Sequence, residues 1–253
     1  MPRQPEGPPP PPVVARIRVR FAKRGRLRFL SHRDIARAFE RGLRRARLPV
    51  ALSAGFSPHP RLSWVGAAPT GAASEAEYVE IAFSAPVTPR WVHEALDAAL
   101  PPGLDVVCCV EAQGRALPDR VDASRWQLRL PGVALAELGV AVPALLARES
   151  LVVERVTKDG KREVDVRGAV VWAVCRAEND TCAILDVVVR HTTPAVRPDD
   201  VLTALSAVAV LSVPVPPEPT RLEQGRLRED GTLADPLAPD RDEAARPAGR
   251  LEA

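Results

Sequence analysis

The segment from Arg16 to Arg47 has the strongest charge asymmetry of this chain. It holds 13 Arg or Lys residues and only two acids, Asp34 and Glu40. The whole chain of 253 residues carries a formal net charge of only +3, so the remaining residues are net acidic. A local basic excess of this size is typical of a surface that meets a polyanion. The alternative is a solvated arginine face in a chain that uses Arg in place of Lys.

The basic segment begins with a pattern of period two. Residues 16–21 (RIRVRF) alternate basic and apolar side chains, which is the pattern of a strand with one buried face. The alternation predicts that Ile17, Val19 and Phe21 point into a core. It also predicts that the arginines between them point outward.

A helix is predicted over residues 34–47. Ser31 and Asp34 stand at its N-cap and N3 positions, where a serine and an acid satisfy the first backbone N–H groups. Its arginines recur every four residues and therefore form one stripe on the helix surface. Like charges at this spacing repel each other, by a few tenths of a kcal/mol per pair. A helix that keeps such a stripe is therefore expected to bind a polyanion, most simply RNA.

Arginine suits this role because its planar guanidinium can bind a phosphate through two hydrogen bonds and can stack on a base. The sequence predicts a phosphate-binding track that joins the strand to the helix. The predicted residues are Arg18, Arg20, Lys23, Arg24, Arg33, Arg37, Arg41, Arg44 and Arg45.

The order of predicted elements is β-α-β-β-α-β, and it recurs loosely in the second half of the chain. This order predicts an α+β fold of two tandem ferredoxin-like units with antiparallel sheets, over residues 15–113 and 120–228. The second unit is expected to carry an inserted hairpin, because an Asp-Gly pair at residues 159–160 favours a tight turn. The Pro-rich leader 1–14 and the charged tail 229–253 are predicted to be disordered.

Two loops supply further candidates for a site. They contain Ser31 and His32 in one loop, and Gly55, Phe56, Ser57, His59 and Arg61 in the other. Because histidine titrates near neutral pH, His32 or His59 could serve as general acid or base in RNA cleavage. The alternative is that these residues stack on a base or cap a helix.

Several functional classes have no support in the sequence. The four cysteines lack CxxC or Cys/His spacing, so neither a metal site nor a cofactor is expected. The N-terminus lacks the apolar region of a signal peptide, and no run approaches the ~20 apolar residues of a membrane span. A cytoplasmic protein without a membrane contact is the expectation.

Four segments carry a resemblance to a known family: LRFLSHRD, AFERGLRRA, SAGFSPHP and SEAEY. Together they make residues 15–225 similar to the bacterial radical SAM-linked proteins, a family defined by a domain of unknown function. In that family the domain occurs alone or at the C-terminus of a B12-binding-type radical SAM protein. The resemblance implies a radical SAM protein with a B12-binding-type domain as partner, and it assigns no catalytic residue. This chain lacks the CxxxCxxC motif that would hold the iron–sulfur cluster of such an enzyme.

The expected function is that of a non-catalytic RNA-binding accessory protein. It would act with a separate radical SAM enzyme in modification of an RNA, with tRNA or rRNA suspected. One alternative is a metal-independent endoribonuclease that uses His32 or His59. That alternative has a fold analogy with the repeat-associated RNA-processing proteins of CRISPR systems (the Cas6-like group). The other alternative is a protein–protein scaffold.

Overall fold

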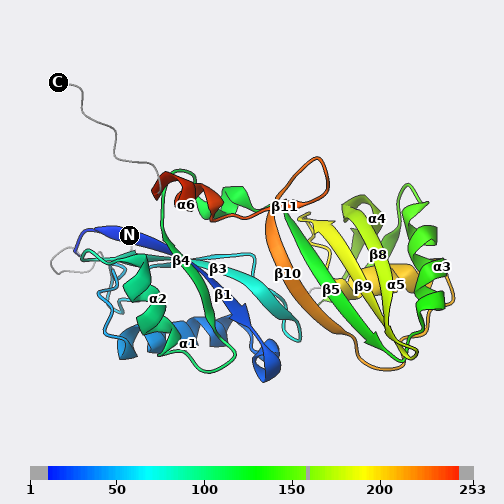
Figure 1. The fold of residues 1–253 in the computed structure, drawn as a ribbon, viewed down its shortest axis with the longest axis horizontal. Helices are drawn as coiled ribbons and strands as arrows, with labels where there is room; N and C mark the ends of the chain where they lie inside the picture. The colour runs from blue at the N-terminus through cyan, green and yellow to red at the C-terminus, as the bar shows by residue number, and fades with distance from the viewer. Residues whose placement is uncertain (1–10, 158–159, 245–253) are drawn as a thin grey trace. The chain divides into compact units, whose positions relative to one another are not determined.

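A computed structural model describes residues 11–157 and 160–244 of the chain (Figure 1). Antiparallel strand pairs and six α-helices in these residues make the α+β fold that the sequence predicts. The described chain divides into two compact units. Unit 1 comprises residues 11–70, 74–119 and 236–244, and unit 2 comprises residues 71–73 and 120–235.

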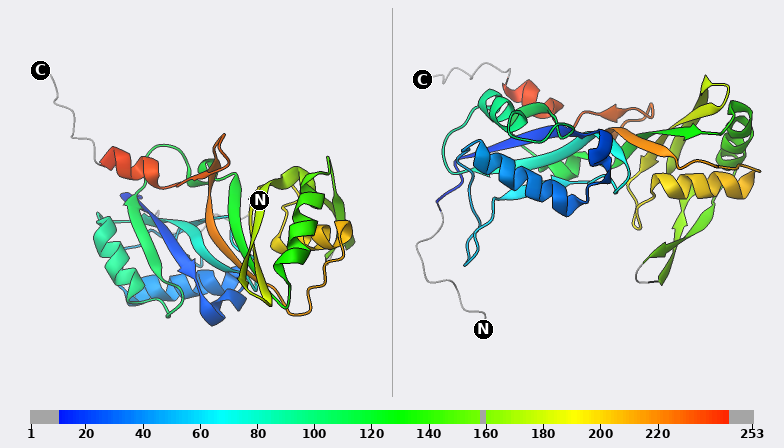
Figure 2. Two further views of the ribbon diagram at one scale, coloured as in Figure 1. Left: turned by 45° about the vertical axis from the view of Figure 1, so that its right-hand side comes forward. Right: turned by 90° about the horizontal axis from the view of Figure 1, so that it is seen from below.

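Unit 1 contains four antiparallel strands in the order β4-β1-β3-β2. The strands are β1 (Ala15–Lys23), β2 (Leu62–Val65), β3 (Ala73–Phe83) and β4 (Val106–Glu111). Its helices are α1 (His32–Arg45), α2 (Pro89–Asp97) and α6 (Ala238–Ala244), with the 3-10 helices η1 (Gly25–Phe29) and η2 (Leu117–Arg120). Figure 2 shows the elements of this unit from two further sides.

The core of unit 1 lies between the sheet and the helices α1 and α2. Ile17, Val19 and Phe21 of β1 are at most 1% exposed and belong to this core, as the alternation predicts. Phe39 of α1 packs its ring 4.6 Å from the ring of Phe21 and 5.1 Å from that of Trp64. Apolar side chains that alternate along β1 therefore fix the sheet face on which α1 lies.

The helix cap predicted at Ser31 is confirmed. The Ser31 hydroxyl accepts a hydrogen bond from the backbone N–H of Asp34, and the Asp34 carboxylate accepts one from the N–H of Ser31. The hydroxyl of Ser31 also donates to Asp34 at 2.6 Å. These bonds lower the pKa of the Asp34 carboxyl, with a smaller contribution from the charges of Arg37 and Arg33.

The predicted disordered tail 229–253 is wrong for residues 229–244. Residues 233–234 form β11 (Leu233–Ala234), which pairs with β10, and residues 238–244 form α6. Leu237 is fully buried and Asp240 is 1% exposed. A compositional criterion misses this segment because strand pairing, polar contacts and single buried residues hold it, rather than a run of apolar residues. The rest of the tail and residues 1–10 of the leader lie outside the described residues.

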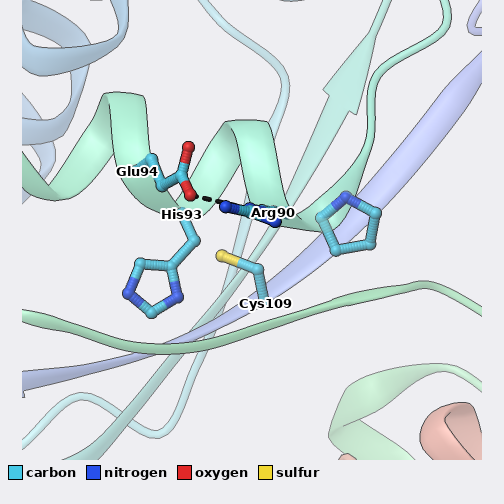
Figure 3. A pocket seen from close by; sticks show the side chains of 5 residues that line it. Arg90, His93, Glu94 and Cys109 are labelled. Atoms are coloured by element: carbon cyan, nitrogen blue, oxygen red, sulfur yellow. Dashed lines mark hydrogen bonds and ion pairs between the residues drawn. The ribbon is translucent and has the colours of Figure 1, made fainter.

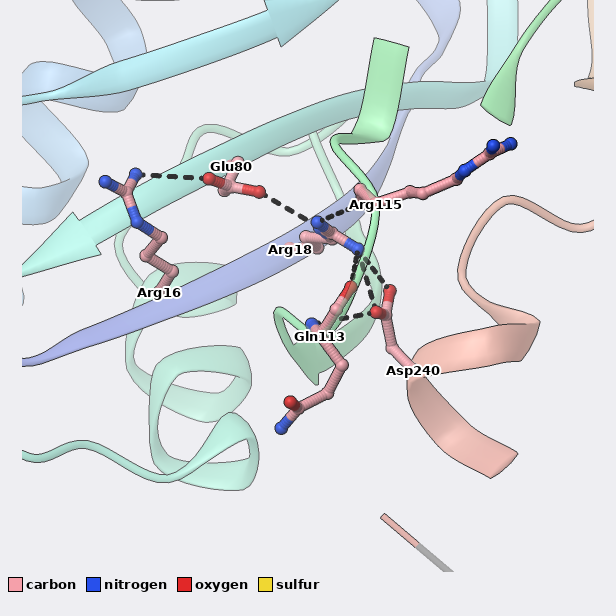
Figure 4. A network of polar contacts seen from close by, with 6 residues as sticks. All are labelled: Arg16, Arg18, Glu80, Gln113, Arg115 and Asp240. Carbon is pink, nitrogen blue, oxygen red and sulfur yellow. Dashed lines mark hydrogen bonds and ion pairs between the residues drawn. The ribbon is translucent and has the colours of Figure 1, made fainter. Parts of the chain in front are cut away.

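Asp240 of α6 meets Arg18 on the sheet face opposite α1 and α2 (Figure 4). The Nη1 of Arg18 donates to both Asp240 oxygens, at 2.8 and 3.0 Å, and its Nε donates to Glu80 at 3.0 Å. The same guanidinium donates to the carbonyls of Gln113 and Arg115. A charge buried to 3% exposure is thus matched by two carboxylates and two carbonyls.

Unit 2 contains four antiparallel strands in the order β10-β5-β9-β8. The strands are β5 (Ala123–Pro131), β8 (Val170–Asn179), β9 (Cys182–Arg190) and β10 (Glu218–Leu227), with the helices α3 (Leu135–Leu146) and α5 (Pro198–Val208). A separate hairpin of β6 (Val152–Thr157) and β7 (Gly160–Asp165) precedes the short α4 (Val166–Ala169). This pairing confirms the predicted hairpin, although two residues of its turn, 158–159, lie outside the described residues.

His191, which follows β9, gives unit 2 a predicted pH dependence. Its Nε2 lies 2.7 Å from the Ser124 hydroxyl, and burial lowers the pKa of the imidazole, with a further decrease from the charge of Arg221. The unfolded chain therefore binds this proton more readily than the folded chain. Consequently the free energy of unfolding is expected to fall as the pH drops below about 6.5.

The measurement is the urea midpoint at pH 7.5 and pH 5.5 for the wild type and for His191→Gln. The difference between the two pH values should be smaller in the variant, because Gln does not titrate. A ring-proton titration of His191 by NMR with a midpoint at or above 6.5 would contradict the prediction.

Within residues 11–157 and 160–244, no helix has the length and hydropathy needed to cross a membrane.

Candidate nucleic-acid interface

Four arginines of α1 share the helix face that points away from the core. Arg33, Arg37, Arg41 and Arg44 are exposed, whereas Ile35, Ala38, Phe39, Gly42 and Leu43 are buried. At 100° per residue the four arginines fall within an arc of about 80°, and the buried residues occupy the opposite side. With a rise of 1.5 Å per residue, the four charges extend over about 16 Å. We call these four residues the α1 arginine surface.

The four arginines of the α1 arginine surface form no ion pair with the described part of the chain, although the charges of Arg33 and Arg37 interact with the Asp34 carboxylate. None of the four guanidinium groups lies within 4.0 Å of a carboxylate of residues 11–157 or 160–244. Arg45 lies at the edge of this face and is not counted with the four, because its guanidinium already has a partner: the Nη1 donates to the carbonyl of Ala99 at 3.1 Å. Glu40 is the one acid of α1 beyond its first turn. The result is a net positive helix face, which Asp34 and Glu40 of the same helix reduce but do not neutralise.

The strand does not extend this ridge. Arg18 is 3% exposed and Lys23 is fully buried, where its Nζ lies 3.1 Å from the carbonyl of Pro69. The Nε of Arg20 donates to the carbonyl of Glu75 at 2.8 Å, and Arg24 forms ion pairs with Glu75 and Asp105.

Arg16, Arg18 and Arg20 moreover lie on the sheet face opposite the one that α1 covers, because Ile17, Val19 and Phe21 occupy the α1 side. The prediction of one continuous track from strand to helix is therefore wrong. The alternation of residues 16–21 correctly predicts which side chains lie on each face of β1. It contains no information about α6, which covers the face that is expected to be exposed.

The two candidate loops are not brought together. His32 begins α1 and packs its ring edge-to-face on Trp64, with 5.2 Å between ring centroids. Its loop lies toward the end of the sheet at which β1 finishes. Gly55, Phe56, Ser57 and His59 belong to an exposed loop that precedes β2, beyond the other end of the sheet, where Ala15 pairs with Phe83. One site that combines His32 with His59 is therefore not formed.

The remaining loop candidate, Arg61, belongs to a third location. It lines a shallow depression of about 300 Å³ together with Arg16, Ser63 and Glu80. Ser63 pairs with Glu80, and Arg16 forms an ion pair with Glu80 at 3.2 Å. This depression lies on the sheet face opposite α1, so Arg61 does not contribute to the α1 arginine surface.

A second depression, of about 470 Å³, was not predicted from the sequence (Figure 3). It lies where α2 meets β4, and Arg90, His93, Glu94 and Cys109 line it. Arg90 and Glu94 neutralise each other across one helical turn at 2.8 Å. Burial raises the pKa of the Cys109 thiol to about 12, which keeps it protonated and a poor nucleophile. Within the described residues, His, Cys, Asp and Glu form no group of three that could hold a metal ion.

Comparison with known families identifies the family of this chain. The model of the family described as an uncharacterized protein conserved in bacteria (DUF2344) matches residues 16–198, and the chain belongs to this family. No curated protein matches the chain. Among solved structures, it is similar to the crystal structure of an unknown protein from Galdieria sulphuraria. That similarity has 16% sequence identity and a TM-score of 0.23, over 83% of this chain and 99% of the other.

Proposed function

We propose that this protein is an RNA-binding accessory protein and that the α1 arginine surface is its phosphate-binding site. The observation that carries the proposal is the set of four exposed guanidinium groups on one helix face, without a carboxylate within 4.0 Å among the described residues. Aligning like charges weakens a helix, and the arrangement gains free energy only when an anion binds along it. Release of counterions from the RNA backbone would supply that gain.

We further infer that the two units are tandem ferredoxin-like units. In support, unit 1 follows the chain order β1-α1-β2-β3-α2-β4 with the spatial strand order β4-β1-β3-β2. Unit 2 shows the equivalent order β10-β5-β9-β8, with the β6–β7 hairpin and α4 inserted between α3 and β8. The proposed RNA surface would then lie on the first helix of the first unit.

The same proposal includes a separate radical SAM protein that acts on the bound RNA. Its support is the resemblance carried by segments such as LRFLSHRD and SAGFSPHP. In this division of labour the accessory protein supplies affinity for the RNA backbone, and the enzyme supplies the chemistry. Purification of the protein from its native cell, with identification of bound RNA and protein, tests this part.

The central test is the triple variant Arg37→Ala/Arg41→Ala/Arg44→Ala. Each lost phosphate contact is expected to lower the slope of log affinity against log salt concentration by about 0.7, so the triple variant should lose about 2. Its helix should remain folded, since Ala has the highest helix propensity and the repulsion is removed. The measurement is a titration of fluorescent RNA at several salt concentrations.

A matched control removes three exposed arginines elsewhere: Arg148→Ala/Arg162→Ala/Arg190→Ala. It changes the net charge equally but leaves α1 intact, so its salt slope should stay near that of the wild type. Equal slopes for the wild type and the α1 variant would contradict the proposal, as would equal losses in both variants. RNA cleavage without metal that is lost in His32→Ala or His59→Ala would instead identify an endoribonuclease.

A further inference from the structure

Phe29 is an exposed aromatic side chain in a chain that has few of them. The sequence contains only ten Phe, Trp and Tyr residues, and five of them are buried: Phe21, Phe39, Tyr78, Phe83 and Trp126. Phe29 is 65% exposed and lies three residues before the start of α1, and only Phe56 is more exposed among the described aromatic residues. Burial of a phenylalanine ring contributes about 1.5–3 kcal/mol, so a ring kept in solvent forgoes that gain.

The local backbone holds this ring outward. Phe29 is the last residue of η1, and the N–H of Leu30 donates to the carbonyl of Leu27 at 3.0 Å. Leu27 and Leu30, three residues apart, pack against the core of unit 1. In a 3-10 helix such residues share one side, so Phe29 points to another side. The guanidinium carbon of Arg28 lies over the Phe29 ring, 5.6 Å from its centroid, so a cation–π contact occupies one face of the ring and leaves the other for a ligand. We call these two side chains the platform.

The platform lies close in the chain to the α1 arginine surface. Only Leu30, Ser31 and His32 separate Phe29 from Arg33, and four residues of chain span at most about 14 Å. The capping box of Ser31 and Asp34 fixes the connection between η1 and α1. The Phe29 ring is therefore within a few nucleotides' reach of a strand of RNA bound at Arg33.

We propose that Phe29 is a stacking site for an unpaired base, and that the protein recognises single-stranded RNA or a loop rather than an uninterrupted duplex. The inference rests on the proposed function of α1 and adds the form of the RNA. Bases inside a duplex already stack on their neighbours and are not available to a side chain. A base of a single strand can lie on the Phe29 ring while the adjoining phosphates lie on Arg33 and Arg37.

The test compares Phe29→Ala with the wild type, using a fluorescent single-stranded RNA and a blunt duplex of the same sequence. Because stacking of a base on an aromatic side chain is worth about 1–3 kcal/mol, single-strand affinity should fall by about 10-fold or more. The affinity for the duplex should not change, nor should the salt slope, because no phosphate contact is lost. Phe29→Trp should retain the single-strand affinity, since it keeps an aromatic face.

Phe56→Ala is the matched control, because Phe56 is 83% exposed and lies in the loop beyond the other end of the sheet. Its single-strand affinity should equal that of the wild type. An unchanged affinity in Phe29→Ala, or an equal loss for duplex and single strand, would overturn the inference. If only the Phe29 result fails while the α1 triple variant loses its salt slope, the proposed function stands without this site. If the triple variant binds like the wild type, the proposed function fails as well.

Discussion

Replacing Asp240 with Asn is expected to release α6 from unit 1. The change removes a negative charge whose two carboxylate oxygens accept hydrogen bonds from the Nη1 of Arg18, at 2.8 and 3.0 Å. Arg18 is only 3% exposed at this site. Removing one partner of a buried ion pair costs about 3–5 kcal/mol. Because Glu80 still pairs with Arg18, we expect the lower end, about 3 kcal/mol.

The measurement is hydrogen exchange of α6 and of the Gln113 amide, which donates to Asp240 at 2.9 Å. A loss of about 3 kcal/mol in docking corresponds to about 100-fold less protection of these amides. Asp242→Asn is the matched control, because Asp242 is exposed on the same short helix and loses the same charge. Equal protection in the two variants would show that the ion pair does not hold α6.

Replacing Phe39 with Ala is expected to lower the free energy of unfolding by about 3–5 kcal/mol. Phe39 is fully buried and joins α1 to the sheet through the rings of Phe21 and Trp64. The substitution removes this burial and leaves a cavity beneath the helix that carries the arginine surface. Urea unfolding, followed by the fluorescence of Trp64 and the other tryptophans, provides the measurement.

Phe56→Ala provides the comparison, because the same atoms are removed from a ring that is 83% exposed. Its effect should stay within about 0.5 kcal/mol, as for most surface substitutions. Hydrogen exchange of β1 peptides shows whether the loss in Phe39→Ala occurs in unit 1. A change below about 1 kcal/mol in Phe39→Ala would mean that the core can collapse around the missing ring, contrary to the prediction.

The local structure of the basic segment was predictable because its signals lie close together in the chain. The alternation of residues 16–21 gives the buried face of β1, and the capping box at Ser31 and Asp34 gives the start of α1. Helical periodicity likewise separates Phe39 from the arginines on the opposite side. Each signal depends only on residues within one or two turns or a few strand positions.

The composition of the candidate site could not be predicted in the same way. Arg18 and Arg33 carry the same charge and stand in equally basic surroundings, yet one is buried and the other is exposed. The difference arises from partners that are distant in the chain, Glu80, the carbonyls of Gln113 and Arg115, and above all Asp240, which lies 222 residues further along. A pattern within the strand contains no information about that partner. The two candidate loops, at Ser31 and His32 and at Gly55–His59, lie at different ends of the sheet, and no local pattern in the sequence indicates this.

The sequence by itself determined which faces of β1 and α1 are apolar, where α1 begins, and that α1 carries a stripe of arginines. These properties follow from local periodicity and capping, which are set by neighbouring residues. The tertiary structure decided which basic residues remain available to an anion. It buries Arg18 beneath α6, ties Arg24 to Glu75 and Asp105, and leaves the α1 arginine surface exposed. Long-range burial and pairing make that selection, because a charge withdrawn from water needs a partner that only the folded chain supplies.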